Sequence, residues 1–204
     1  MIEIVMGIVL VMLSGWKSRE FARLGVRGLC AVAILTALSA AGRALMSGIP
    51  SVQPSSFIIM VCGATLGGGA GLFCGMLTAV LSNLILGSLG PYTVWQMFLW
   101  GIMGLLASRP MNANVVVRVL YGFVWGFIFG WVMNLWFPLA GFVPLNWTSF
   151  VAACVASFSF DLAHALCNAG LCLVFGGVFM KVVRRYVPLR SSLPENIPQE
   201  SDRL

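Results

Sequence analysis

Charged residues are scarce in this chain. They make up 9% of its 204 residues, and only six residues are acidic. A soluble domain carries roughly 25% charged residues, so a chain that is 60% hydrophobic has too little polar surface to cover a water-soluble globule. The composition excludes a soluble protein and predicts an all-α integral membrane protein, built from apolar helices of about 20 residues.

Motifs for chemistry are also missing. The chain has one histidine, and it contains no Walker A phosphate loop, no GxSxG and no HExxH, so we expect no ATP hydrolysis by this chain and no enzymatic activity. Its basic residues form no patch with interleaved aromatics, which argues against nucleic-acid binding. The six cysteines sit in apolar runs without a CxxC pair, so we expect no metal and no disulfide. They are Cys30, Cys62, Cys74, Cys154, Cys167 and Cys172.

The apolar runs divide the chain into an anchor and a bundle. We predict an N-terminal membrane anchor over 1–16, a cytoplasmic linker over 17–27, a bundle of six transmembrane helices over 28–180, and a disordered basic cytoplasmic tail over 181–204. The predicted spans of the bundle are 28–46, 56–66, 72–86, 92–107, 119–139 and 147–180, and the last is long enough for a span plus an extra turn or a kink. External loops are expected at 47–55, 87–91 and 140–146, and the glycine-rich segment 67–71 is expected to be a flexible turn.

The basic residues give the orientation. All but one of the twelve lie in three short polar segments, which the threading above places on one side of the membrane. They are Lys17, Arg19, Arg23, Arg27, Arg109, Arg118, Lys181, Arg184, Arg185, Arg190 and Arg203. Cytoplasmic loops retain Lys and Arg, so this pattern predicts a multi-pass plasma-membrane protein with a cytoplasmic C-terminus. The same residues could also contact anionic lipid headgroups.

Small residues recur at four-residue spacing in the predicted span 28–46. Ala33, Ala37 and Ala41 form a flat stripe along which another helix can approach closely. The partner helix belongs either to this protein's own bundle or to a separate membrane subunit.

Three polar residues share one face of the last predicted span. Asp161, His164 and Asn168 fall at i, i+3 and i+7. A carboxylate at membrane depth needs a partner, and Arg43 is the natural one because no other cation falls inside the apolar stretches. The face is either a structural ion pair between Arg43 and Asp161 or part of a cavity open to the outside.

Other polar groups lie near predicted external helix ends. They are the amides Gln53, Asn83, Gln96 and Asn134. Amides donate and accept hydrogen bonds, which suits a neutral or amide-bearing ligand. Trp95, Trp136 and Trp147 cluster at the same ends, either as an aromatic belt or as a stacking surface for a flat ligand.

Several stretches within 28–180 also carry a family resemblance. They are the alanine stripe with Gly42-Arg43, Val52-Gln53-Pro54, residues 71–83 and 90–97, Tyr121-Gly122-Phe123, Met133-Asn134-Leu135-Trp136-Phe137 and residues 161–168. As a set they resemble the substrate-binding S component of an energy-coupling factor (ECF) vitamin transporter, in a branch similar to S components linked with cobalamin uptake. The anchor lies outside this six-helix pattern.

The resemblance implies a substrate-specific subunit that captures a vitamin or related micronutrient, such as cobalamin or a precursor, at the outer face. It implies docking through the alanine stripe to a membrane T (coupling) subunit and two ATPase subunits. Those partners would use ATP, and this chain would bind no cofactor of its own. The expected ligand contacts are Gln53, Asn83, Trp95, Gln96, Asn134, Trp136, Asp161, His164 and Asn168. The alternatives are a self-contained secondary carrier or channel, and a small intramembrane hydrolase built on His164.

Overall fold

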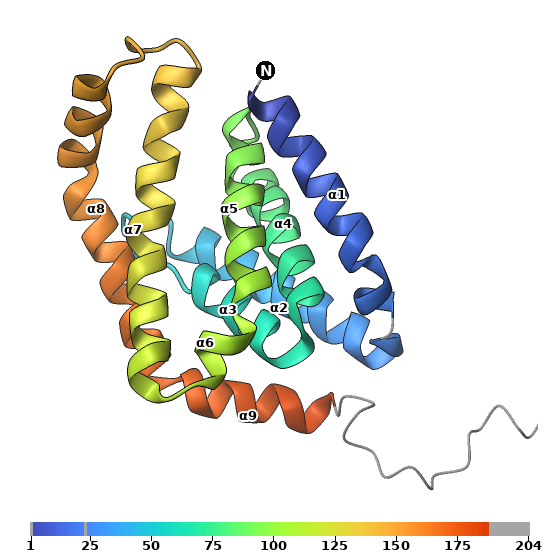
Figure 1. Cartoon of the computed structure of the whole chain (residues 1–204). Coiled ribbons are helices and arrows are strands. Elements are labelled where there is room, and N and C mark those ends of the chain that lie inside the picture. Colours follow the sequence, from blue (N-terminus) through green and yellow to red (C-terminus); the bar gives the residue numbers. More distant parts are fainter. Residues whose placement is uncertain (1, 23, 188–204) are drawn as a thin grey trace, which may run out of the picture.

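The computed structural model describes residues 2–22 and 24–187, which are mostly helical and contain no strand. Nine helices occupy these residues (Figure 1). They are α1 (Ile2–Ala22), α2 (Gly25–Leu45), α3 (Ser55–Leu66), α4 (Gly68–Ile85), α5 (Tyr92–Leu106), α6 (Ser108–Asn112), α7 (Val115–Leu139), α8 (Trp147–Val174) and α9 (Gly176–Tyr186). Arg23, and the part of the predicted tail at 188–204 with Arg190 and Arg203, lie outside the described residues.

Four helices, α2, α4, α7 and α8, are long and apolar enough to cross a membrane. The apolar part of α1 (Ile4–Ser18), α3 and α5 are shorter. The prediction of an all-helical, membrane-type protein is therefore confirmed. The predicted count of one anchor plus six helices is wrong, because the described residues form nine helices, including the short α6 and the separate α9.

Two predicted connections are shorter than expected. Helix α1 continues through the first charged residues to Ala22, and α2 already begins at Gly25, so most of the predicted linker 17–27 is helical. The expected flexible turn at 67–71 is confined to Gly67, whose φ of 101° is open to glycine but strained for other residues. The glycines that follow belong to the first turn of α4.

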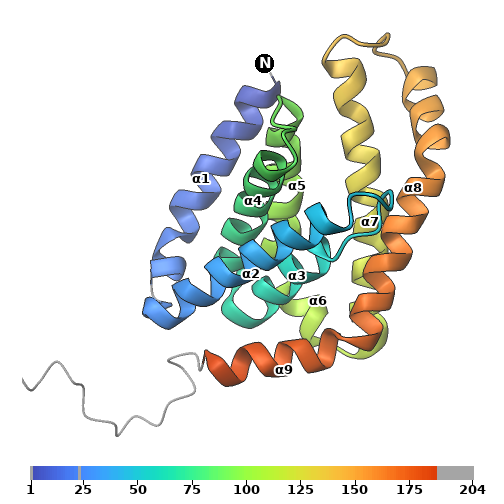
Figure 2. The same ribbon diagram turned by 180° about the vertical axis from the view of Figure 1, so that it is seen from behind.

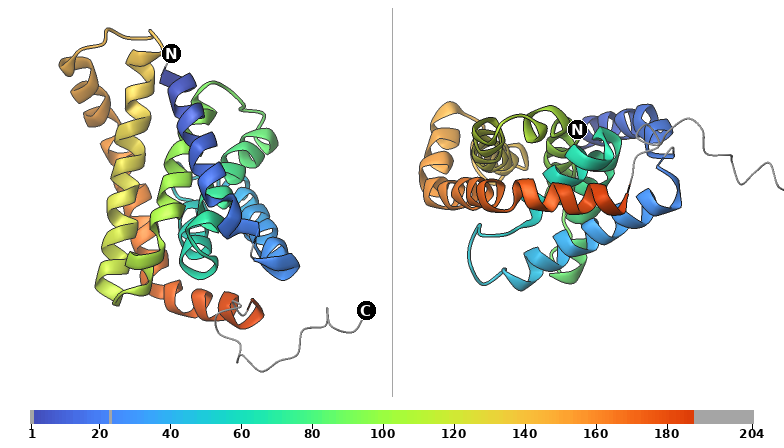
Figure 3. Two further views of the ribbon diagram at one scale, coloured as in Figure 1. Left: turned by 45° about the vertical axis from the view of Figure 1, so that its right-hand side comes forward. Right: turned by 90° about the horizontal axis from the view of Figure 1, so that it is seen from below.

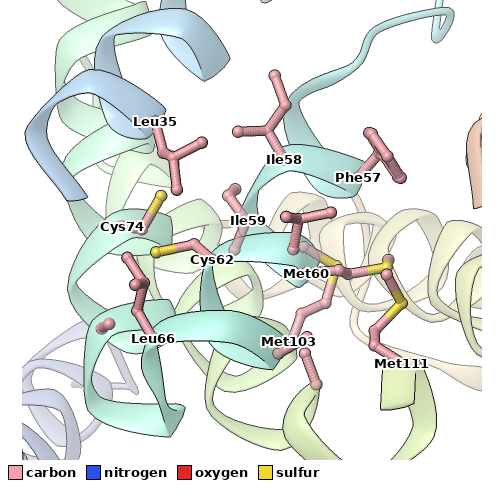
Figure 4. Packing of buried hydrophobic residues seen from close by; sticks show 14 of the residues in the cluster. Leu35, Phe57, Ile58, Ile59, Met60, Cys62, Leu66, Cys74, Met103 and Met111 are labelled. Atoms are coloured by element: carbon pink, nitrogen blue, oxygen red, sulfur yellow. The ribbon is translucent and has the colours of Figure 1, made fainter. Parts of the chain in front are cut away.

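Helix α3 forms the centre of the molecule. All its residues are buried, which fits a sequence that is apolar on every side. Its Met60 packs with Met103 and Met111, and the thiols of Cys62 and Cys74 point toward each other (Figure 4). Helices α2, α4 and α5 surround α3 with α1 on the outside, while α7 and α8 form a separate antiparallel pair (Figures 1 and 2).

Glycines allow α7 and α8 to approach closely. Gly122, Gly126 and Gly130 follow one another at four-residue spacing along α7. A Cβ added at Gly126 would lie 2.4 Å from the Cα of Ala165, and one at Gly130 would overlap the carboxylate of Asp161. This stripe of small residues holds the Asp161 face of α8 against α7.

All but one of the connections between the described helices lie at the two ends of the bundle. We call the end with α6 and α9 the basal end, and the end with the α4–α5 and α7–α8 connections the distal end (Figure 1). The α1–α2 connection also lies at the basal end, so the segments that carry most of the basic residues come together there (Figures 1 and 2). The connection between α2 and α3, predicted as an external loop at 47–55, lies at mid-height beside α8 (Figure 2), where the Sγ of Cys167 contacts the carbonyl of Gln53 at 3.6 Å.

The predicted single span 147–180 is two helices. Helix α8 ends at Val174, and after Phe175 the chain turns so that α9 runs across the base of the bundle (Figure 3). Phe179 of α9 packs against Phe57 of α3, with 5.8 Å between ring centroids. The first residues of the predicted tail, from Lys181 to Tyr186, are therefore helical.

Candidate functional site

Arg43 of α2 organises a network of buried polar groups. Its Nη1 donates to Ser82 Oγ at 2.7 Å and to Asn83 Oδ1 at 2.5 Å, both on α4. The Nδ2 of Asn83 donates to Thr93 Oγ1 at 2.9 Å and to Gln96 Oε1 at 2.7 Å, both on α5. Three helices are thus joined by amide and hydroxyl groups that are otherwise costly to bury.

The predicted ion pair between Arg43 and Asp161 is wrong. Arg43 donates its hydrogen bonds to Ser82 and Asn83 of α4. Asp161 instead accepts a hydrogen bond from Ser157 Oγ on its own helix at 2.8 Å. The reason lies in the packing, because α2 contacts α3 and α4 while α8 pairs with α7. Among the described residues, neither Arg43 nor Asp161 therefore forms an ion pair.

Trp100 connects this network to His164. The guanidinium of Arg43 lies over the Trp100 ring, 5.4 Å from its centroid, and Trp100 Nε1 donates to Ser56 Oγ at 3.1 Å. Ser56 Oγ is in turn 2.9 Å from His164 Nε2. Because an indole N–H only donates, the serine hydroxyl accepts from Trp100 and can donate to an unprotonated Nε2. Phe129 of α7 stacks on Trp100 and meets the edge of the His164 ring.

A second chain of hydrogen bonds links α7 with α8. Asn134 Nδ2 donates to Ser157 Oγ at 2.8 Å, and Ser157 Oγ donates in turn to Asp161 Oδ2. Asn134 and Ser157 also line an open groove of about 590 Å³ whose other lining residues are mostly apolar. Of the nine predicted ligand contacts, Asn134 is the one that this groove includes.

Two tryptophans nearer the distal end have indole N–H groups without a hydrogen-bond partner. Trp95 and Trp136 each bury an Nε1 that has no hydrogen-bond partner. Trp136 of α7 packs edge-on against Tyr92 at the start of α5, with 5.7 Å between ring centroids, and Trp95 follows Tyr92 by one helical turn. Buried polar groups are nearly always hydrogen-bonded, so two unpaired donors close to the α5–α7 contact indicate a place for an acceptor from outside the protein.

Asn168 lies farther from the distal end than Trp95 and Trp136 do. It is completely buried, and neither atom of its amide has a partner. A Cβ on Gly122 would lie 3.2 Å from the backbone oxygen of Asn168. Gly122 precedes Trp136 by fourteen residues of helix, or roughly 21 Å at 1.5 Å per residue. Asp161, His164 and Asn168 on the predicted face of α8 are all buried, but they and the distal tryptophans do not converge on one point.

The described residues leave the alanine stripe uncovered. Ala33 and Ala37 are exposed and Ala41 is partly exposed, while the neighbouring Ala40 is fully buried. The structure therefore does not use the stripe for packing within its own described residues.

Sequence reasoning missed two central residues, Ser56 and Trp100. Ser56 is 108 positions from His164 and follows another serine at a helix start, which gives no sequence signal for such a contact. Trp100 resembles an ordinary core residue in the sequence. Only the packing of the helices reveals that Trp100 contacts both the guanidinium of Arg43 and the hydroxyl of Ser56.

Taken together, the distal half presents mainly hydrogen-bond donors. Arg43 uses only Nη1 in hydrogen bonds to the described residues, and the two indole N–H groups are buried without a partner. Such a set suits a ligand rich in carbonyl, amide or carboxylate oxygens. No family model, curated protein or solved structure matches the chain, so the site itself is the basis for the function proposed next.

Proposed function

We propose that this protein is a non-enzymatic membrane subunit that captures a small, acceptor-rich nutrient for import. The observation that carries the proposal is the pair of buried, unpartnered indole donors of Trp95 and Trp136. They lie on two helices that meet at Tyr92 and Trp136. Leaving a buried donor unpaired costs roughly 1–3 kcal/mol, a cost that a bound ligand would remove.

The resemblance to ECF S components supplies the finer proposal. In it, the distal end faces the outside of the plasma membrane, the C-terminus is cytoplasmic, and the ligand is a vitamin such as cobalamin or a precursor. The exposed alanine stripe on α2 then docks a coupling subunit, and partner ATPases supply the energy. A corrinoid carries several amide side chains, which agrees with a site dominated by donors.

The test measures the small molecules that the purified protein retains, by mass spectrometry, and then the affinity for cyanocobalamin by calorimetry. Trp136→Phe removes the open N–H and keeps an aromatic ring. We expect it to weaken binding about tenfold, the equivalent of about 1.4 kcal/mol. Trp131→Phe is the matched control, because Trp131 is on the same helix, is about half exposed and lines an outer groove.

Equal retention by Trp136→Phe and the unmodified protein would remove Trp136 from the site. A purified protein that retains no small molecule and binds no cyanocobalamin, even after reconstitution in lipid, would contradict the proposal of nutrient capture.

One observation favours an intramembrane hydrolase as a second candidate. Ser56 and His164 are in hydrogen-bonding contact, the arrangement of a nucleophile and its base. Ser56 is, however, only 1% exposed and also accepts the indole N–H of Trp100. A fluorophosphonate probe decides between the two candidates. Labelling that disappears in Ser56→Ala would establish the hydrolase, and we expect no labelling.

A further inference from the structure

Helix α9 has three distinct sides. Gly176, Met180 and Val183 are buried against the bundle. The side that they leave open is divided between a basic stripe and an apolar ridge. The basic stripe consists of Lys181, Arg184 and Arg185, and the apolar ridge consists of Val178, Val182 and Tyr186. An amphipathic helix that lies in a membrane interface has this distribution of side chains.

The apolar ridge is exposed and follows helical spacing. Val178, Val182 and Tyr186 succeed one another every four residues, and their side chains are 64%, 46% and 73% exposed. The ridge continues the exposed end of α8, where Val174 and Phe175 are also more than half exposed. Since α8 is long and apolar enough to cross a membrane, the ridge extends the exposed apolar surface of a candidate membrane span.

The helices α3 and α8, against which α9 packs, bring no acidic side chain to the basic stripe. From α6 through α9 the single acidic residue is Asp161, which lies in α8 against Gly130. Arg118 of α7 extends the stripe, because its Nη2 lies 3.9 Å from a Cβ built on Gly177. Arg184 is fixed at the base by hydrogen bonds to Asn112 of α6 and to the carbonyl of Ala64.

We propose that α9 is an interfacial helix whose basic stripe binds the phosphate-bearing headgroups of anionic lipids while its apolar ridge enters the acyl-chain boundary. The occupant is a lipid because the two stripes lie side by side on one helix and the ridge continues the exposed apolar surface of α8. A free anion would need the cations and would gain nothing from the ridge. Headgroup contacts of this kind strengthen with each Lys or Arg near the surface.

The experiment uses the full chain, delipidated and reconstituted with neutral phosphatidylcholine alone or with added phosphatidylglycerol. Bound lipid is counted by native mass spectrometry, and the midpoint of thermal unfolding is recorded in both mixtures. The double variant Lys181→Gln/Arg185→Gln spares Arg184 and removes two exposed charges from the stripe. We expect it to retain phosphatidylglycerol on the order of tenfold less well than the unmodified protein.

The matched control is Arg27→Gln/Arg109→Gln. It removes the same charge from exposed residues near the ends of α2 and α6, and we expect it to retain phosphatidylglycerol like the unmodified protein. Equal losses in both double variants would mean attraction to net charge alone and would overturn the proposal. It would also be overturned if inorganic phosphate displaced the lipid or reproduced its stabilisation, or if the protein showed no preference for phosphatidylglycerol.

Discussion

At the scale of single residues, Asn83 and Asn168 are both completely buried amides with opposite surroundings. Asn83 bonds to Arg43, Thr93 and Gln96, whereas both amide atoms of Asn168 are unpaired. An amide that completes a network stabilises the fold, and its loss leaves its partners buried and unsatisfied. An unpaired amide has no such partners to lose.

We therefore expect Asn83→Ala to lower the free energy of unfolding by about 2 kcal/mol or more, because it leaves a guanidinium and an amide without their partner. Asn168→Ala should be close to neutral, since the loss of two unsatisfied groups offsets the small cavity that is created. Thermal unfolding of the two variants in the same detergent checks this. Equal destabilisation would mean that Asn168 has a partner that the structure does not show.

At the scale of elements, the α7–α8 pair depends on the three glycines of α7. Gly126→Ala would place a methyl group 2.4 Å from the Cα of Ala165, where backbone must move. We expect it to destabilise the protein by about 1–3 kcal/mol, the usual cost of overpacking. Gly170→Ala is the control: nothing lies within 4 Å of its added Cβ, and alanine is the better helix former, so it should be neutral or slightly stabilising.

A second element-scale prediction concerns α2. Under the proposed function, Ala37→Trp should abolish co-purification with the coupling and ATPase subunits while ligand binding is retained, because a bulky side chain blocks a flat helix contact. Leu38→Trp places the same ring on an exposed position beside the stripe and should leave the complex intact. Normal assembly of the Ala37→Trp variant would remove the stripe from the interface.

Helix positions in the middle of the chain were predictable because apolar runs end at clear signals. The start of α5 after Pro91, the end of α7 at Leu139 and the start of α8 at Trp147 agree with the predicted bounds. The length of 147–180 allowed for a kink, but its position at Phe175 was not predicted, because no proline marks it and because α9 turns to bury Met180 and Val183 against the bundle. The glycine stripe of α7 is present in the sequence at the same spacing as the alanine stripe, and so could have been recognised.

The candidate site was less predictable than the helices. Hydropathy isolates Arg43, Asp161 and His164 as polar groups in apolar runs, but it contains no information about which helix packs against which. Asp161 was therefore paired with Arg43 as the one cation inside the apolar stretches, although the structure gives Arg43 the amide of Asn83 and the ring of Trp100. Contacts between distant segments, such as Ser56 with His164, follow from the packing of helices alone.

At the scale of the whole molecule, the two ends of the bundle differ in charge, and this difference predicts the orientation. The basal end collects α6, α9 and the adjoining ends of α1 and α2 (Figure 1), and these segments contain most of the described basic residues. Because Lys and Arg are retained in the cytoplasm during insertion, we expect the basal end to be cytoplasmic and the α7–α8 connection to be external.

Single cysteines test this orientation. Asn114→Cys lies in the basal connection before α7, and Leu145→Cys lies in the distal connection before α8, where the native leucine is 68% exposed. A membrane-impermeant maleimide added to intact cells should label Leu145→Cys above the background of the unmodified chain. It should label Asn114→Cys only after the cells are opened. The opposite pattern would place Arg109 and Arg118 outside, turn the donor-rich distal site toward the cytoplasm, and contradict uptake from the exterior while leaving the packing of the helices unaffected.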